Sequence, residues 1–352
     1  MSESVNPNSG TEPLLEVRDL RVRIERDTGV VRPLNGVSFR IHEGQSVGIV
    51  GESGCGKTMA SNSLLRILPR RAEITGGSME FSTKAGERVD LARIDPMSPR
   101  MRQIRGGEIS MIFQEPMTAF SPVHTVYDQI AEMIRLHDPQ ADKQQRRQRV
   151  VELLNLVGIP DPEVRADDYS FQLSGGMRQR AMIAMALASS PRLLIADEPT
   201  TALDVTVQAK VLKLIERMQR ELNIALMLIT HDLGVVAHMV SYVYVMYLGR
   251  VVEEGPVEAI FHDPKHPYTA ALLRSIPTLA SKSQRLEPIA GNVPSADRLP
   301  TGCPFHTRCT EKVGDICHQH MPARVDMGGG HATSCFRHTD NRLDNLEEHD
   351  DG

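Results

Sequence analysis

The hydrophobic positions along the chain follow two periods, the two-residue alternation of strands and the longer period of helices. The alternation of strands appears first along the chain. Apolar and polar residues alternate over residues 14–24 and 37–41, which is typical of strands that bury one face. Short and nearly continuous apolar runs predict strands that are buried on both faces. These runs lie at residues 46–50, 193–196, 225–229 and 242–247.

Helical periodicity lies between the apolar runs. The pattern over residues 57–68 predicts a helix that Pro69 stops. A longer helix is predicted over residues 205–222, because its apolar residues recur on one face. The residues of that face are Val207, Val211, Leu214, Ile215, Met218 and Leu222. Buried strands that alternate with helices predict an α/β domain with parallel strands.

Residues 125–180 have a different character from the segments around them. They contain helical patterns over residues 126–136, 147–157 and 178–188, and no clear strand. We therefore expect a helical insert within the α/β domain, which spans residues 14–255.

The two ends of the chain differ from this domain in composition. After Gly255 the strand signals fade, and prolines and four cysteines mark a small, cysteine-rich C-terminal module over residues 256–338. Residues 1–13 are rich in Ser, Asn, Pro and Gly, and residues 339–352 are acidic, so we expect both stretches to be flexible.

Composition and charge narrow the classes of protein to consider. A length of 352 residues predicts about two domains, and 40% hydrophobic residues suffice for a sizeable core. The net charge is −5, so the chain lacks the excess of positive charge that would attract a nucleic acid. Neither a signal peptide nor a run of 18 apolar residues is evident. We therefore expect the chain to lie in the cytosol or at a cytosolic surface.

The segment GESGCGKT at residues 51–58 follows a predicted buried strand and opens a predicted helix. It matches the phosphate-loop pattern G-x-x-x-x-G-K-[ST], which requires this context. Glycines let backbone N–H groups curl around phosphate oxygens, while Lys57 reaches the β- and γ-phosphates and Thr58 binds Mg²⁺. A glycine turn with an exposed lysine is the alternative, but this context makes it a poor one. The predicted nucleotide-binding residues are Gly51, Glu52, Ser53, Gly54, Cys55, Gly56, Lys57 and Thr58.

The segment LLIADEP at residues 193–199 is an apolar strand that ends in two carboxylates. Asp197 is expected beside the phosphate loop, where it can hold Mg²⁺ through water. Glu198 points to the other side of the chain and is the candidate base for an attacking water. Two acids at a strand end also suit a solvated turn, but the phosphate loop upstream favours catalysis.

The segment LSGGMRQR at residues 173–180 places a Ser-Gly-Gly turn before a predicted helix. The Ser174 hydroxyl and the amides of Gly175 and Gly176 form a second candidate phosphate site in the same chain. Because one nucleotide cannot easily use both sites, we infer that the second serves a nucleotide held by another subunit. The simpler alternative is that Ser174 only caps the helix.

Together these motifs resemble those of the nucleotide-binding subunits of ATP-binding-cassette transporters, over roughly residues 14–255. LSGGMRQR resembles the family's signature motif. The sequence FQEP, from Phe113, resembles its glutamine loop, which implies that Gln114 contacts Mg²⁺ and the membrane subunit. TALD, ending at Asp204, resembles the D-loop, and His231 in THDL resembles the switch histidine that contacts the γ-phosphate. The implied fold is α/β, a P-loop ATPase cassette with a helical insert.

One position departs from the family pattern. The family usually has an aromatic residue in the first strand that stacks on adenine, and the matching residue here is Ile24. An isoleucine can pack against the purine, but it supplies no aromatic stacking.

Four of the five cysteines lie close together near the C-terminus, at Cys303, Cys309, Cys317 and Cys335. Disulfides are not expected in the cytosol. Four thiolates can hold a [4Fe–4S] cluster or zinc, although the close pairs usual in zinc sites are absent, and four free thiols are the third possibility. The segment HPYTAALLRSIP at residues 266–277 resembles the one that follows the cassette in oligopeptide and dipeptide importer ATPases. This resemblance implies the iron–sulfur cluster, with zinc as the alternative.

The resemblance implies an ATPase subunit that powers the import of dipeptides or oligopeptides, with ATP and Mg²⁺ as cofactors. The implied partners are two membrane-spanning permease subunits, an extracytoplasmic solute-binding protein and a second ATPase subunit, which we expect to be a paralogue. The implied location is the cytoplasmic face of the inner membrane.

Three alternatives remain open at this point. The same subunit type also powers import of nickel, glutathione or sugars. Soluble cassette proteins of DNA repair or translation usually carry long coiled-coil inserts or two cassettes, and neither is seen here. The C-terminal module is alternatively a metal- or redox-binding regulatory unit. Neighbouring genes for permeases and a binding protein would distinguish most of these alternatives.

Overall fold

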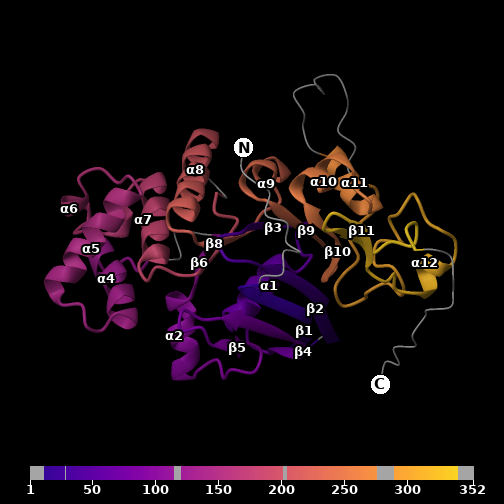
Figure 1. Cartoon of the computed structure of the whole chain (residues 1–352), viewed down its shortest axis with the longest axis horizontal. Coiled ribbons are helices and arrows are strands. Elements are labelled where there is room, and N and C mark those ends of the chain that lie inside the picture. The colour runs from indigo at the N-terminus through magenta and orange to yellow at the C-terminus, as the bar shows by residue number, and fades with distance from the viewer. Residues whose placement is uncertain (1–11, 28, 115–119, 201–203, 276–288, 340–352) are drawn as a thin grey trace.

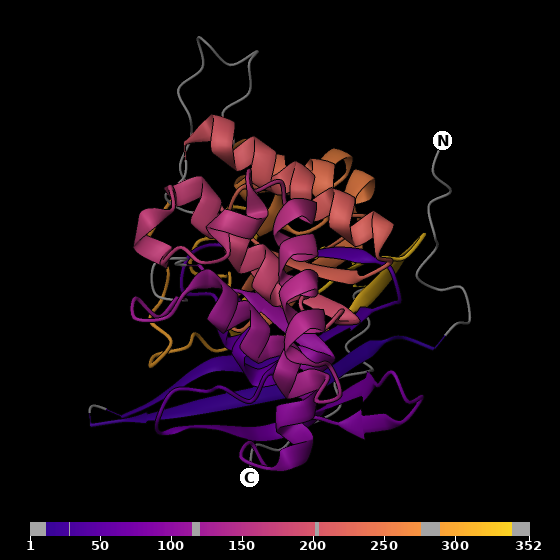
Figure 2. The ribbon, with the colours of Figure 1, turned by 90° about the vertical axis from the view of Figure 1, so that its left-hand side faces the viewer.

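Two sheets and a set of helices build the computed structural model, which describes residues 12–27, 29–114, 120–200, 204–275 and 289–339 (Figure 1). A four-stranded antiparallel sheet lies below the larger sheet in this view, and helices lie above the larger sheet and to one side. Seen from that side, helices α4 to α7 stand in front of both sheets (Figure 2).

The larger sheet has the strand order β11-β12-β10-β9-β3-β8-β7-β6. Its parallel strands are β3 (Ser46–Val50), β6 (Ile109–Ile112), β7 (Leu193–Asp197), β8 (Ala225–Ile229) and β9 (Tyr242–Tyr247). Four of these strands occupy the predicted apolar runs, so the predicted α/β sheet is confirmed. Strand β6 has only four residues, which is too short for a reliable periodic signal.

Strand β7 shows why these runs are apolar at every position. Leu193 and Ile195 pack into the core shared with the antiparallel sheet. Leu194 and Ala196, on the other face, pack into the core shared with the helices. A strand that is covered on both sides has no solvent-facing positions, so its sequence loses the two-residue alternation.

The antiparallel sheet has the order β2-β1-β4-β5. Its strands are β1 (Leu15–Arg26), β2 (Gly29–Ile41), β4 (Ala72–Ser82) and β5 (Arg88–Asp90). In β1, Leu20 and Val22 are buried while Arg21 and Arg23 are exposed, as the alternation predicts.

The expected helical insert consists of α4 (Val126–His137), α5 (Lys143–Leu156), α6 (Pro162–Arg165), the 3-10 helix η1 (Ser170–Gln172) and α7 (Gly175–Leu187). Helices α4 and α5 each begin with a capping box, formed by Thr125 with Asp128 and by Asp142 with Gln145. Each box satisfies two backbone N–H groups that have no partner within the helix. The three predicted helices of this region are confirmed.

The remaining helices are α1 (Lys57–Leu64), α2 (Pro99–Gly107), α8 (Val205–Glu221), α9 (Leu233–Met239), α10 (Val257–His262), α11 (Pro267–Arg274) and α12 (Ile316–Gln319). The apolar face predicted for α8 is largely buried, with Val211, Ile215 and Met218 fully enclosed. Leu222, which was predicted to extend this face, lies beyond the helix and is 45% exposed.

Helix α1 is shorter than predicted, because it ends at Leu64. Arg66 adopts a left-handed conformation with a φ of +54°. The N–H groups of Arg66 and Ile67 donate to the carbonyls of Ser63 and Asn62, at 3.1 and 3.0 Å. These two bonds form a Schellman motif, which closes the helix before the predicted proline stop.

The C-terminal residues continue the larger sheet at its antiparallel edge. Strand β10 (Arg250–Pro256) pairs with β9 on one side and with β12 (His331–Thr333) on the other, and β11 (Val325–Gly328) pairs with β12. No sequence pattern predicts β11 or β12, since strands this short take their conformation from pairing with distant residues.

Some predictions fall on residues outside the described ranges. These are residues 1–11 at the N-terminus, Glu115 and Pro116 of FQEP, residues 201–203 of TALD, and residues 340–352 of the acidic tail. Within the described ranges, no helix has both the length and the apolar character needed to cross a membrane.

Candidate active site

The phosphate loop connects β3 to α1, and two of its glycines have no room for a side chain. Gly51 has a φ of +148°, and a Cβ there would lie 2.2 Å from the carbonyl oxygen of Met246. Gly56 has a φ of +105°, and a Cβ there would lie 2.4 Å from the carbonyl oxygen of Pro33. Because both obstacles are backbone atoms, the path of the loop itself requires glycine at these positions.

Lys57 is buried, and its ammonium group folds back over the loop. Its Nζ donates to the carbonyl oxygen of Gly51 at 2.8 Å and to that of Glu52 at 3.1 Å. The Sγ of Cys55 lies 3.8 Å from the same Nζ, and burial raises the pKa of this thiol. The loop therefore holds one buried cation together with a small, neutral packing group.

The opposite side of the loop is open. Ser53, Gly54 and Thr58 are exposed. A Cβ built at Gly54 would point into open space. An anionic ligand therefore has direct access to the loop and to the N-terminus of α1.

Asp197, the last residue of β7, reaches the phosphate loop and is suited to hold a cation. Burial raises the pKa of Asp197, while the Thr58 hydroxyl interacts with its carboxylate and lowers this pKa. Oδ1 of this carboxylate is buried without a hydrogen-bond partner among the described residues. A buried carboxylate oxygen without a donor beside a threonine hydroxyl fits the oxygen ligands that Mg²⁺ requires. Thr58 and Asp197 therefore offer oxygen atoms suited to a cation at this site, where Gln114 is also predicted to contribute.

Glu198 lies between two polar side chains from other motifs. Nε2 of Gln114 donates to its Oε2 at 3.1 Å, and Nδ1 of His231 lies 3.0 Å from its Oε1. Its side chain is 17% exposed, against 69% for His231. The structure therefore brings together Gln114, Glu198 and His231, which the sequence had placed in three separate motifs.

The predicted second phosphate site begins helix α7. Ser174 is the N-cap residue, and its Oγ accepts a hydrogen bond from the Met177 N–H at 3.3 Å. Ser174 and Gly175 are exposed, whereas a Cβ at Gly176 would lie 3.2 Å from a methyl carbon of Val207. Ser174 therefore does cap the helix, as the simpler alternative proposed, and it remains accessible from outside the chain.

Of the D-loop motif, only Asp204 lies within the described residues. It is the N-cap of α8, and its Oδ1 accepts hydrogen bonds from the N–H groups of Thr206 and Val207, both at 3.0 Å. Asp204 is therefore bonded to the backbone of Val207, and the Val207 side chain lies beside Gly176 of the predicted second phosphate site.

Two residues that contact the phosphate loop were not identified from the sequence. Arg308 pairs with the side chain of Glu52, and the hydroxyl of Tyr268 accepts a hydrogen bond from the Glu52 N–H. Tyr268 belongs to the HPY sequence and Arg308 precedes Cys309, but neither pattern indicates a contact with the phosphate loop. No local pattern identifies a contact across such a distance along the chain.

The structure does not support the predicted metal centre at the cysteines. Cys303, Cys309, Cys317 and Cys335 are free, and all except Cys309 are buried. Within the described ranges, no group of three or more His, Cys, Asp or Glu side chains is arranged to hold a metal ion. Burial raises the pKa of Cys303 to about 12 and also raises the pKa values of Cys309 and Cys335.

Cys303 and Cys317 instead belong to the apolar core that includes Phe305 and Tyr268. The expectation of a cysteine-rich metal module, with iron–sulfur or with zinc, is corrected accordingly, and no function is derived from a metal there.

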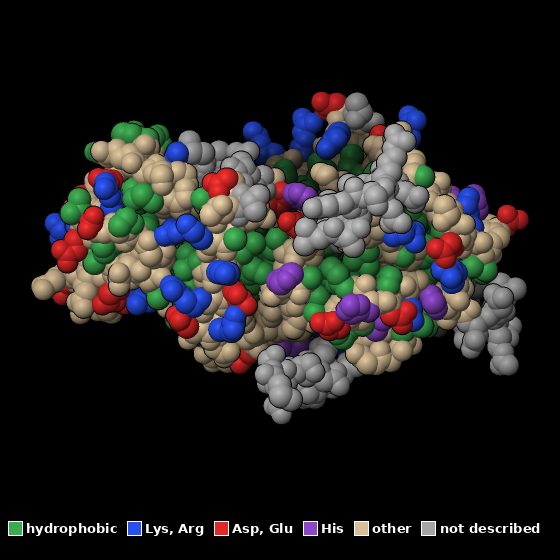
Figure 3. Space-filling model, turned by 90° about the horizontal axis from the view of Figure 1, so that it is seen from above, with side chains coloured by type: hydrophobic (Ala, Val, Ile, Leu, Met, Phe, Trp, Pro, Cys, Tyr) green, Lys and Arg blue, Asp and Glu red, His purple; other side chains and the backbone are tan. Residues whose placement is uncertain are grey.

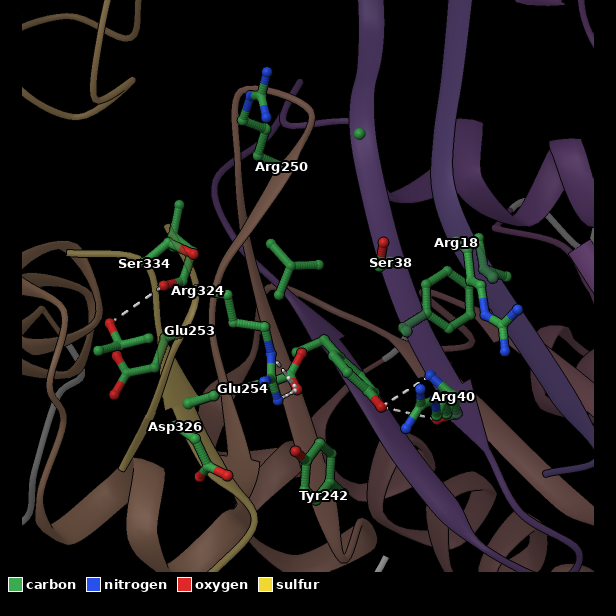
Figure 4. Close-up of a pocket in the computed structure, with 18 of the residues that line it drawn as sticks. Arg18, Ser38, Arg40, Tyr242, Arg250, Glu253, Glu254, Arg324, Asp326 and Ser334 are labelled. Atoms are coloured by element: carbon green, nitrogen blue, oxygen red, sulfur yellow. Dashed lines mark hydrogen bonds and ion pairs between the residues drawn. The ribbon is translucent and has the colours of Figure 1, made fainter. Parts of the chain in front are cut away.

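A separate cavity of about 570 Å³ lies between β1, β2, β10 and the C-terminal strands (Figure 4). Charged side chains of both signs line it, and several of them form ion pairs. Arg324 binds Glu254 at 2.6 Å, and Arg40 binds Glu16 at 2.7 Å. On the face seen in Figure 3, acidic and basic side chains are likewise interspersed. Neither surface presents the single-sign field that would attract a large polyanion.

Comparisons with known proteins agree with the geometry of the site. The family model for "ABC transporter" matches residues 34–201, and that for "Oligopeptide/dipeptide transporter, C-terminal region" matches residues 252–317. The chain is 47% identical to the probable peptide ABC transporter ATP-binding protein y4tR of Sinorhizobium fredii, over 94% of this chain and 96% of that protein. It is 44% identical to the dipeptide transport ATP-binding protein DppD of Escherichia coli, over 92% and 96%.

Among solved structures, one titled as the dimeric structure of MJ0796, a bacterial ABC transporter cassette, is similar to this chain. The TM-score is 0.60 and the identity is 25%, over 69% of this chain and 98% of that one.

Proposed function

The chain belongs to the family of ATP-binding proteins of peptide ABC transporters, and we propose that it hydrolyses ATP to power the import of dipeptides or oligopeptides. Relatives named for peptide and dipeptide transport match it over more than nine tenths of its length. The match to the oligopeptide and dipeptide transporter C-terminal region favours peptides over nickel, glutathione or sugars.

Nucleotide binding falls to the phosphate loop. Its amides and the buried Lys57 bind the β- and γ-phosphate oxygens, and the N-terminus of α1 adds positive potential. Thr58 and Gln114 would hold Mg²⁺ directly and Asp197 would hold it through water, and the ion neutralises charge on the phosphates when it is bound. The buried Oδ1 of Asp197, which lacks a donor among the described residues, supports this assignment.

Hydrolysis depends on Glu198. Its carboxylate accepts a proton from the attacking water, whose oxygen bonds to the γ-phosphorus while the bond to the β–γ bridging oxygen breaks. Hydrogen bonding to Gln114 and His231 fixes both carboxylate oxygens in place. His231 also contacts the γ-phosphate and stabilises the charge on the transferring group.

A second ATPase subunit completes each site in this proposal. Ser174, Gly175 and Gly176 bind the phosphates of the partner's ATP, and the equivalent segment of the partner binds those of this chain. The exposure of Ser174 and Gly175 at the start of α7 supports this role. The two subunits close head to tail around two ATP molecules, and hydrolysis reopens them. We expect the partner to be a paralogue.

Two membrane-spanning permease subunits dock on the helical insert and on the loop at Gln114. An exposed apolar patch supports this contact, because Val123 is 74% exposed and Phe171 is 64% exposed. A β-bridge between Thr125 and Tyr169 brings the two segments together, and the rings of Tyr169 and Phe171 stack with centroids 5.5 Å apart. Exposed apolar patches of this kind are typical of protein interfaces.

The location of the chain in the cell follows from its contact with the permeases. The chain sits peripherally on the cytoplasmic face of the inner membrane, held there by the permeases. An extracytoplasmic solute-binding protein delivers the peptide from the other side, so the peptide never contacts this chain.

One observation carries the proposal: Glu198, directly after the residue that meets the phosphate loop, is held by Gln114 and His231. The test is uptake of a radiolabelled dipeptide by cells that lack this gene and express a plasmid-borne copy. The wild-type copy should restore dipeptide uptake, and the Lys57→Ala copy should not. Lys143→Ala, an exposed lysine that begins α5, is the matched control and should restore uptake fully.

Two outcomes would contradict this function. Uptake restored by Lys57→Ala would mean that the phosphate loop does not power transport. Restoration of nickel or glutathione uptake, with dipeptide uptake unchanged, would reject the proposed substrate class.

A further inference from the structure

The C-terminal region holds the second residue of the phosphate loop. Nη1 of Arg308 donates to Oε2 of Glu52 at 2.6 Å, and Nη2 of Arg308 donates to Oε1 at 3.0 Å. The two residues are 256 positions apart in the sequence. Two parallel hydrogen bonds between a guanidinium and a carboxylate fix both the position and the orientation of the acidic side chain.

The backbone of Glu52 is held as well. Its N–H donates to the hydroxyl oxygen of Tyr268 at 2.8 Å. Tyr268 is fully buried, and burial raises the pKa of its hydroxyl, so the group stays neutral. Glu52 is therefore tied to the C-terminal region through its backbone and its side chain, next to the glycine that begins the loop.

Arg308 is itself fixed by several contacts. Its Nε donates to the carbonyl oxygen of Ala290 at 3.1 Å, and Nη2 donates to that of Ile289 at 3.3 Å. The guanidinium carbon lies 5.9 Å from the ring centre of Tyr247 and 6.0 Å from that of Phe305. Only 3% of the Arg308 side chain is exposed. An arginine with this many partners has little freedom to follow Glu52 if the loop moves.

Tyr247, Tyr268 and Phe305 pack together as an aromatic cluster that supports the phosphate loop. The ring centres of Tyr247 and Tyr268 are 4.7 Å apart, and each lies 5.3 Å from that of Phe305. All three residues are buried. The position of the loop therefore depends on packing between β9, α11 and the segment around Arg308.

The contact between Arg308 and Glu52 also neutralises a negative charge in the phosphate loop. The phosphate loop must accept phosphates that carry several negative charges, and Glu52 brings a further negative charge into it. The bidentate hydrogen bonds with Glu52 raise the pKa of Arg308, so the guanidinium remains charged and neutralises the carboxylate. Without Arg308, the unpaired carboxylate would repel the incoming nucleotide.

We propose that Arg308 and Tyr268 are positioning residues for nucleotide binding, through which the C-terminal region holds the phosphate loop in its binding conformation and neutralises Glu52. Neither residue touches the nucleotide. The C-terminal region thereby sets the affinity of the cassette for nucleotide. The proposal rests on nucleotide binding by the phosphate loop, which is part of the proposed function.

The test is a double-mutant cycle on the full-length chain, with the dissociation constant of MgADP measured by calorimetry. Arg308→Ala should raise this constant by about tenfold when Glu52 is present. In the Glu52→Gln background the carboxylate is gone, and the same Arg308→Ala change should raise it by no more than about twofold. This difference separates electrostatic coupling through Glu52 from general damage to the fold.

Conservative variants and a matched control keep the test informative if Arg308→Ala folds poorly. Arg308→Lys keeps the charge and should retain most of the affinity, and Tyr268→Phe should weaken MgADP binding by about threefold through loss of one hydrogen bond. Arg324→Ala removes another C-terminal arginine that pairs with a glutamate, and it should leave the dissociation constant unchanged.

ATP hydrolysis supplies a second readout. Because positioning of the loop affects ground state and transition state alike, Arg308→Ala should raise KM for ATP with little change in kcat. An equal effect of Arg308→Ala in both backgrounds, or none in either, would overturn the proposal. Failure of the wild-type chain to bind MgADP would instead reject the proposed function.

Discussion

Nδ1 of His231 lies 3.0 Å from Oε1 of Glu198, across the carboxyl ends of two neighbouring strands. Strands β7 and β8 are parallel and pair Asp197 with Ile229, so the residues that follow each strand emerge side by side. Glu198 has a φ of +46°, and its N–H donates to the carbonyl of Ile229 at 2.8 Å. The register of the sheet therefore sets the geometry of the proposed catalytic base.

Loss of His231 should slow hydrolysis without preventing nucleotide binding. His231→Ala removes a contact to Glu198 and the proposed contact to the γ-phosphate, so turnover should fall by about 10²-fold. The dissociation constant of ATP should change little. His238→Ala, which alters a histidine bonded only to its own helix through the Gly234 carbonyl in the described structure, is the control. Normal turnover by His231→Ala would rule out the assigned role.

The Asp197 carboxylate should lower the stability of the nucleotide-free chain, although the proposed Mg²⁺ site needs it. Burial raises its pKa above the unfolded value, so the charged form opposes folding. The stability that this group contributes is complete below the unfolded pKa and is lost as the pH rises through the folded pKa. Asp197→Asn should therefore stabilise the nucleotide-free chain at neutral pH, seen as a higher free energy of unfolding. The gain should shrink as the pH falls through the raised pKa of Asp197 in the folded chain.

Urea unfolding of wild type and Asp197→Asn at several pH values measures this effect. The same variant should lose the extra stabilisation that Mg²⁺ gives to the ATP-bound chain, because the carboxylate that holds the ion is gone. A variant less stable than wild type at neutral pH would show that the carboxylate is not destabilised by burial.

Ser174→Arg should block the shared site to which Ser174 contributes, while leaving nucleotide binding by this chain's own phosphate loop intact. Combining it with a lysine lesion in the partner's phosphate loop places both lesions on one shared site and leaves the other whole. Combining Ser174→Arg with Lys57→Ala in this chain damages both sites. The first combination should hydrolyse ATP faster, and equal rates in the two mixtures would argue against the head-to-tail arrangement.

The buried cysteines should react slowly with iodoacetamide in the native chain. A pKa of about 12 for Cys303 leaves very little thiolate at pH 7.5, so its alkylation should be about 10³-fold slower than that of an exposed cysteine. Mass spectrometry of quenched samples gives the rate at each cysteine. Rapid alkylation of Cys303 would show that burial does not suppress its thiolate. Stoichiometric iron with sulfide, or zinc, in the purified protein would reverse the correction made for the metal centre.

The sequence predicts the parts of the site that are local. The phosphate loop, the acidic end of β7 and the turn at Ser174 are each short patterns in which adjacent residues carry the chemistry. The strands beside them are apolar at every position, because both faces are covered. These features require no knowledge of distant parts of the chain.

Long-range contacts could not be predicted in the same way. Arg308 pairs with Glu52 only because β10, α11 and the C-terminal residues fold back on the cassette, and no periodic pattern encodes this return. The end of α1 at Leu64 could not be predicted for a different reason, since arginine rarely adopts the left-handed conformation that Arg66 has just beyond it. The cysteine spacing suggested a metal centre, but spacing alone does not bring four sulfurs into one arrangement.

ATP turnover by a complex in which both cassettes carry Glu198→Gln or its equivalent tests directly whether Glu198 is the catalytic base. The change keeps the size and hydrogen bonding of the side chain but removes the base. Turnover should fall by about 10²- to 10⁴-fold, while the dissociation constant of ATP stays close to that of the wild type. Hydrolysis at a near-wild-type rate would contradict the assignment of Glu198 as the catalytic base.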